Sequence, residues 1–142
     1  MIKKKLYDIS LLSNYEKIKF YINKNFFKLF FYNKEEFLNP KINIFLEKKN
    51  NNNFFIFKFY FIGEITLRCD ITYKKFIFKI NKKKMLNIIF SNNKYVNEES
   101  DNYLIIPLNS RKINIAKYIY ESINFMVPFK KINPKIKKNI EF

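Results

Sequence analysis

The chain contains one cysteine, Cys69, and no histidine. A cysteine becomes a strong nucleophile when a neighbouring base takes its proton, and histidine is the usual base near neutral pH. Zinc sites likewise combine several cysteines and histidines. Cys69 falls in an apolar row with Ile65 and Leu67, where a thiol behaves as a small hydrophobe. We therefore expect Cys69 to be buried, unliganded and slow to react.

Carboxylates are sparse, and their only close group is Glu98, Glu99 and Asp101. That stretch is typical of a solvated loop, because a divalent-metal site there would lack a fourth ligand. Glu121 follows Lys117 by four residues, which is the spacing of an ion pair on a helix surface. A phosphate-cradling loop is excluded because the chain has one glycine. We expect neither enzymatic activity nor a cofactor or metal.

A cationic surface with an exposed aromatic is the best-supported candidate site. The candidate RNA-binding residues are Lys58, Tyr60, Arg68, Lys74, Lys75 and Lys79. They fall on the polar face of two predicted neighbouring strands or at the turn between them. Such a face suits phosphate contacts combined with base stacking. It is equally typical of the solvated side of a half-buried sheet, and the residues alone leave both interpretations open.

The formal net charge of +16 fits a composition bias, but it also has a physical effect on binding partners. Lys, Asn, Ile, Phe and Tyr make up 98 of the 142 residues, and 26 of the basic residues are Lys against 2 Arg. All five residue types have A/T-rich codons, so the composition fits a strong mutational bias, as in a reduced symbiont genome. The charge nevertheless creates a field that attracts polyanions such as RNA.

Alternating apolar and polar residues predict an antiparallel sheet. Strands are expected over residues 16–23, 41–48, 54–70, 76–80 and 103–108, with 85–90 continuing the sheet. The apolar face of 54–70 includes Gly63, and a glycine inside a strand marks a bulge, a bend or a close backbone approach. We expect a bent strand at that point.

The strands over 54–70 and 76–80 are predicted to form a hairpin. Pairing Cys69 with Phe76 also pairs Leu67 with Phe78 and Ile65 with Ile80, so both apolar rows share one face. The same register places Thr66 opposite Lys79 and Arg68 opposite Ile77. The turn is expected to centre on Thr72 and Tyr73, or to be slightly longer.

Two helices complete the expected α+β fold. A short N-terminal helix over 25–31 has Asn25 as its N-cap. A main C-terminal helix starts at Asn114, packs on the sheet and ends at Pro128, since proline cannot continue the hydrogen-bond ladder. The sheet is expected to be mostly antiparallel and strongly bent. Residues 1–129 form a single domain, and 130–142 form a basic, loosely ordered tail.

Two segments of the chain carry a family resemblance. The first runs from Phe61 through Gly63 and Cys69 to Phe76, and the second from Asn114 through Glu121 to Pro128. Their order and spacing resemble the YceD family of large-subunit ribosomal RNA accumulation proteins over residues 54–134, with a weaker match back to Leu6. Thr72 replaces the second cysteine of many members, and Asn114 replaces the usual Asp at the helix start.

The resemblance implies a ribosome biogenesis factor that binds 23S ribosomal RNA or its precursor, with a large-subunit ribosomal protein as a second candidate partner. The alternative is a protein-interaction adaptor whose charge reflects composition bias. Met1 and its basic neighbours are not followed by the apolar segment of a secretory signal. We expect a cytoplasmic location in a bacterium or symbiont and no membrane partner.

Overall fold

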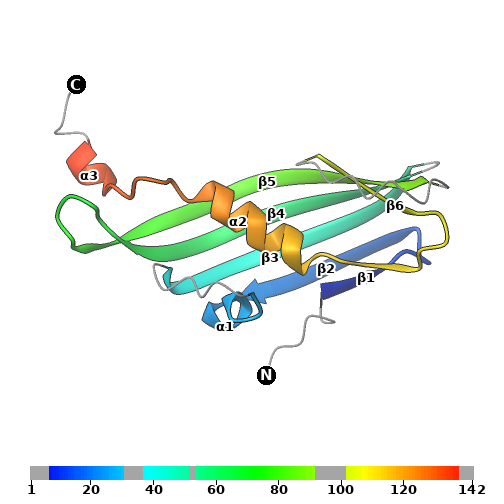
Figure 1. Cartoon of the computed structure of the whole chain (residues 1–142), viewed down its shortest axis with the longest axis horizontal. Helices are drawn as coiled ribbons and strands as arrows, with labels where there is room; N and C mark the ends of the chain where they lie inside the picture. The colour runs from blue at the N-terminus through cyan, green and yellow to red at the C-terminus, as the bar shows by residue number, and fades with distance from the viewer. Residues whose placement is uncertain (1–6, 31–36, 52–53, 92–101, 138–142) are drawn as a thin grey trace.

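The computed structural model describes residues 7–30, 37–51, 54–91 and 102–137 (Figure 1). The elements are β1 Asp8–Ser10, β2 Tyr15–Ile22, α1 Lys24–Phe27, β3 Leu38–Asn51, β4 Phe54–Arg68, β5 Lys75–Ser91, β6 Tyr103–Pro107, β7 Lys112–Asn114, α2 Ala116–Met126 and α3 Pro134–Lys137. The fold is therefore mostly β with added helices, as the sequence predicts at the level of α+β class.

Most strands belong to a five-stranded sheet in the order β2-β3-β4-β5-β6. Neighbours from β2 to β5 are antiparallel, whereas β6 runs parallel to β5 at the edge. Strands β1 and β7 form a separate two-stranded sheet that the alternation pattern did not predict. Both have only three residues, too few to display a period of two.

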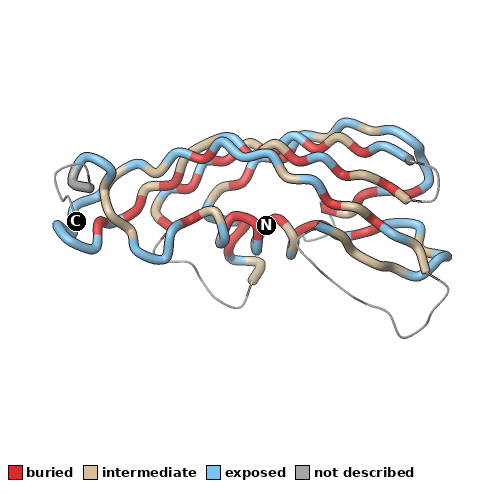
Figure 2. The backbone as a smooth tube through the Cα atoms, turned by 90° about the horizontal axis from the view of Figure 1, so that it is seen from above, coloured by how far each residue is buried: buried red, intermediate tan, exposed pale blue. Residues whose placement is uncertain are grey.

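Strand β4 shows how the sheet divides its side chains between two faces. Phe55, Phe57, Phe59 and Phe61 are buried, while Lys58 between them is exposed. Buried and less buried positions alternate along the strands in Figure 2. Helix α2 lies across one face of the sheet in Figure 1 and buries Ala116, Ile119, Ser122 and Ile123. We call the opposite side, which carries Lys58, the outer face.

Gly63 lies where β3 and β4 approach each other closely. A Cβ atom at Gly63 would lie 2.1 Å from the carbonyl oxygen of Lys41 and 2.7 Å from the Cα atom of Ile42. The β3–β4 register shifts between Leu38 and Lys41, beside this contact. The close backbone approach is confirmed, and the irregularity beside it lies on β3 rather than on β4, whereas a bent strand at Gly63 stays a prediction.

The predicted hairpin register was wrong by two residues. Leu67 pairs with Phe76, Ile65 with Phe78 and Gly63 with Ile80. The loop is shorter than the predicted pairing required, because the Cys69 N–H donates to the Lys74 carbonyl at 2.8 Å. Tyr73 closes the loop with a φ of 59°. A shift of two residues leaves every side chain on its predicted face, so the buried row is unchanged.

Helix α1 begins earlier than predicted. Asn23, not Asn25, is the N-cap, and its Oδ1 accepts from the Asn25 N–H at 3.0 Å. The helix ends at Phe27, so it is shorter than the predicted 25–31 segment, whose last residue lies outside the described residues. Phe26 and Phe27 are both buried, which fixes the helix by tertiary packing rather than by its own length.

Helix α2 ends before Pro128 as predicted but begins later. Asn114 is the last residue of β7, and Ile115 occupies the N-cap position. Asn114 still serves the helix, because its Oδ1 accepts from the Ala116 N–H at 3.0 Å. Its Nδ2 also donates to Asp8 at 2.7 Å. Pairing with β1 therefore keeps Asn114 extended while its side chain satisfies a helix donor.

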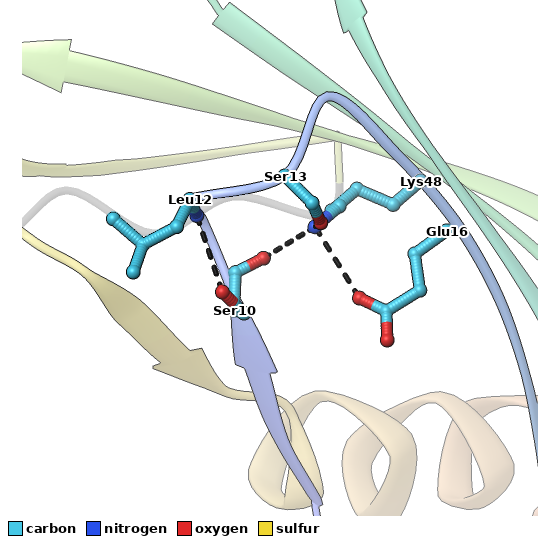
Figure 3. Close-up of polar contacts among 5 residues, drawn as sticks. All are labelled: Ser10, Leu12, Ser13, Glu16 and Lys48. Carbon is cyan, nitrogen blue, oxygen red and sulfur yellow. Dashed lines mark hydrogen bonds and ion pairs between the residues drawn. The ribbon is translucent and has the colours of Figure 1, made fainter.

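A buried lysine anchors the turn between β1 and β2 (Figure 3). Lys48 has no exposed surface, and its Nζ donates to the Ser10 carbonyl at 2.5 Å and to the Ser13 hydroxyl at 2.7 Å. The Glu16 carboxylate lies 3.4 Å away. A buried ammonium is tolerable when it is paired and hydrogen-bonded in this way. Lys48 thus belongs to the structure and not to a solvent-facing cationic surface.

The chain after α2 returns to the hairpin loop. The Asp70 N–H donates to the Lys131 carbonyl at 2.6 Å, and the Lys131 N–H donates to the Asp70 carboxylate at 2.7 Å. Short helix α3 follows. The described part of the predicted tail therefore contacts the domain, while residues 138–142 lie outside the described residues. A domain boundary at residue 129 stays a prediction.

We expect Gly63→Ala to lower the free energy of unfolding by about 2–4 kcal/mol, because the new methyl group overlaps backbone that cannot rotate away. Urea unfolding followed by circular dichroism measures the change. Ile62→Ala, at the exposed neighbouring position, is the control and should cost less than about 1 kcal/mol. Equal losses in the two variants would contradict the close approach.

Candidate nucleic-acid interface

The outer face contains an open groove of about 780 Å³ across β2, β3, β4 and β5. Side chains from all four strands line it, including Lys17, Lys19, Phe45, Lys58, Tyr60 and Lys83. Long antiparallel strands bring these residues together because each strand directs every second side chain to the same side. The lining combines cations with aromatic rings at the centre of the sheet.

One cross-strand row organises the groove. Lys19 lies opposite Phe45, Phe45 opposite Tyr60, and Tyr60 opposite Lys83. We call these four residues the aromatic row. The Lys19 Nζ lies 5.5 Å from the Phe45 ring centroid, and the Lys83 Nζ lies 5.6 Å from the Tyr60 centroid. These distances allow cation–π attraction at each end of the row.

The two rings of the aromatic row leave surface available to a ligand. Their centroids are 6.4 Å apart with 40° between the planes, so they are tilted rather than stacked face to face. Phe45 is 44% exposed, and Tyr60 is half-buried. Phe45 and Tyr60 are cross-strand neighbours on the outer face, and a group of partly exposed apolar side chains is more informative than a single one. Planar bases can stack on rings of this kind.

The groove carries little negative charge to oppose an anion. Among the described residues that line it, Glu47 is the acidic one. The Glu47 carboxylate forms an ion pair with Lys49 at 3.0 Å, and this hydrogen-bonded contact holds the pKa of Glu47 below its usual range. Hydrogen bonding to Tyr15 raises the pKa of Lys17. Lys17 therefore stays cationic across the physiological range, and the groove keeps a net positive potential.

The six predicted site residues divide into two groups. Lys58 and Tyr60 line the groove. Arg68, Lys74, Lys75 and Lys79 lie toward the hairpin loop. Arg68 lies eight residue positions after Tyr60 along β4, and eight steps of a strand span about 26 Å. The structure therefore spreads the predicted residues along one face and does not gather them into one patch.

Two residues of the hairpin group have structural neighbours that the predicted register missed. Arg68 lies opposite Lys75 rather than Ile77, and Lys79 opposite Glu64 rather than Thr66. The Arg68 guanidinium donates to the Tyr73 carbonyl at 2.9 Å, so it braces the hairpin loop. A substitution of Arg68 would therefore change the loop as well as the surface charge.

Sequence reasoning missed Lys17, Lys19, Phe45 and Lys83 as groove residues. The signal was present in the alternation of β2 and β3, whose polar faces were predicted but not joined to that of β4. Lys83 lies within the basic run Lys82 to Lys84, whose members alternate between the two faces of β5. On the helix side, Lys84 donates to the Ser122 hydroxyl at 3.3 Å and ties α2 to β5.

Cys69 is buried, as predicted, but its surroundings are polar. Hydrogen bonds from the backbone of Asn133 and Thr72 lower the pKa of Cys69 to about 7, with the Thr72 hydroxyl contributing further. Thr72, at the position of the expected second cysteine, therefore supports the sulfur by hydrogen bonding. The expectation that Cys69 lies in a purely apolar environment was wrong. The slow reaction of its thiol and the absence of a bound ligand stay predictions.

Comparisons with protein-family models, curated proteins and solved structures return no match.

Within residues 7–30, 37–51, 54–91 and 102–137, no group of three or more Cys, Asp or Glu side chains is arranged to hold a metal ion. The cluster Glu98, Glu99 and Asp101 lies outside the described residues. Across the described helices, none has the length and apolar character needed to cross a bilayer.

The pKa of Cys69 predicts a pH dependence of stability. The folded pKa of about 7 is below the ordinary thiol value of 9.0, so folding favours the thiolate. This contribution is complete above the unfolded pKa and is lost as the pH falls through about 7. The free energy of unfolding of the wild type, minus that of Cys69→Ala, should rise from pH 7 to pH 9. A flat difference across that range would contradict the lowered pKa.

Proposed function

We propose that the chain binds large-subunit ribosomal RNA, either 23S or its precursor, and supports its accumulation and the assembly of the large subunit. The observation that carries the proposal is the aromatic row, which places a cation at each end of two partly exposed rings. Lysines capture phosphates, and the rings offer stacking surfaces to unpaired bases. No cofactor is needed for this binding.

The arrangement favours single-stranded RNA over duplex RNA. Bases in a helix are stacked on one another and cannot reach Phe45 or Tyr60, whereas the bases of loops and single-stranded ends can be splayed onto aromatic rings. Phosphates on either side of a stacked base can then approach Lys19 and Lys83. The resemblance to the YceD family supports ribosomal RNA as the source of that strand, and the net charge of +16 supports a polyanion in general.

Affinity for single-stranded RNA should fall steeply with salt, because phosphate contacts release counterions. If about four lysines of the groove contact phosphates, the logarithm of the association constant should fall with the logarithm of salt at a slope of about −3. Fluorescence anisotropy with unpaired ribosomal RNA fragments measures this slope. No detectable binding at low salt would contradict RNA binding and favour the protein-interaction adaptor.

A charge reversal in the groove should locate the RNA site. Lys19→Glu combined with Lys83→Glu reverses both ends of the aromatic row and should weaken RNA binding at least about tenfold, equivalent to about 1.4 kcal/mol. Tyr60→Leu keeps the charge but removes a stacking surface. It should weaken RNA binding by about 1–3 kcal/mol, which is the contribution of one base stacked on an aromatic ring.

Lys75→Glu combined with Lys79→Glu is the matched control, because it changes the net charge equally at the hairpin end of the same face. It should leave most of the affinity, and circular dichroism should show that every variant is folded. Equal weakening by both double variants would mean diffuse attraction without a groove site. Stronger weakening by the control would move the site to the hairpin end, where the sequence first placed Arg68 and Lys75.

A further inference from the structure

Strand β5 has an outer edge that is only partly paired. The strand has 17 residues, and β6 pairs with Asn87 to Ser91 at one end of it. Within the described part of the chain, no backbone hydrogen bond reaches the outer edge of β5 between Lys75 and Leu86. An edge with unpaired N–H and C=O groups is a template for a further strand.

The residues that face this free edge follow from the pairing with β6. The Asn87 N–H donates outward to the Asn102 carbonyl at 2.9 Å, and the Ser91 carbonyl accepts from Leu108 at 3.1 Å. Backbone groups alternate with a period of two, and the β4–β5 register is unbroken. The residues with outward N–H and C=O groups are therefore Ile77, Lys79, Asn81, Lys83 and Met85. All five are exposed.

Charge decides what kind of strand can pair there. Lys79 and Lys83 project on the outer face of the edge, with Ile77 and Met85 beyond them at either end. A second copy of β5 paired in antiparallel fashion around Asn81 would place these lysines against lysines, and like charges directly opposite each other are destabilising. A strand with carboxylates opposite Lys79 and Lys83 would replace this repulsion with attraction. The edge therefore disfavours self-pairing and favours an acidic segment.

We propose that an extended acidic segment of a partner protein adds a strand to β5 between Ile77 and Met85. Main-chain hydrogen bonds supply affinity, and alternate side chains supply specificity. Carboxylates face Lys79 and Lys83, while apolar side chains of the segment pack beside Ile77 and Met85. The inference goes beyond RNA binding and does not rest on it, although Lys83 belongs to both surfaces.

The test uses the whole chain and a labelled peptide as long as the stretch 77–85. The peptide carries glutamates facing Lys79 and Lys83 and β-branched residues at its ends. Asn81→Pro removes one outward N–H and leaves the bonds to β4 in place. It should raise the dissociation constant at least about tenfold. Asn81→Ala keeps the N–H and should bind within about twofold of the wild type, and a peptide with lysines for glutamates should not bind.

Equal affinity for wild type and Asn81→Pro would overturn the proposal, because the peptide would then bind through charge alone. Absence of binding to the wild type, or a wild-type dimer that Asn81→Pro dissociates, would also overturn it. If circular dichroism shows that Asn81→Pro is unfolded, a peptide methylated on its edge-facing amides replaces the variant. Retained binding of that peptide to the wild type would then refute strand addition.

Discussion

The long strands β3, β4 and β5 each have two faces, and one helix of eleven residues can cover only part of one of them. This constraint governs the rest of the structure. The covered face takes the phenylalanine row of β4, because burying each of those rings stabilises the fold by about 1.5–3 kcal/mol. The outer face must remain compatible with water, so it collects lysines. The neighbouring pair of partly exposed rings, Phe45 and Tyr60, is then notable on that face, since burial does not explain the pair.

Strands β2, β4 and β5 could be predicted from the sequence because period-two alternation over many residues is a strong local signal. The hairpin register and the helix starts could not. Loop length depends on how the Cys69 and Lys74 backbones meet, and two registers that differ by two residues bury the same side chains. Asn23 and Asn25 are equally good caps locally, so the choice between them is made by the packing of Phe26 and Phe27.

Only the part of the candidate site that lies on a single strand could be predicted from the sequence. Lys58 and Tyr60 belong to one strand, and alternation alone places them on one face. Their neighbours Phe45 and Lys83 come from other strands, and naming them requires the pairing of β3 and β5 with β4. That pairing depends on contacts between residues far apart in the sequence. A register that is wrong by two residues assigns the wrong cross-strand partner to every residue of the strand. The sequence therefore places Lys58 and Tyr60 on the face that carries the groove, but it does not identify the row of residues across that face.

Composition bias and selection act on different properties of the same lysines. A bias toward Lys codons can set how many lysines the chain carries. It does not determine which face of a strand a lysine lies on or how deeply its side chain is buried. The fold assigns Lys48 to a buried turn anchor, Lys84 to the helix side, and Lys83 to the groove and to the edge of β5 that no described strand pairs. Each place gives the ammonium different neighbours, and therefore a different energetic consequence when its charge is reversed. The number of lysines is thus weak evidence for function, whereas their positions beside exposed rings and unpaired backbone are physical features that a ligand can recognise.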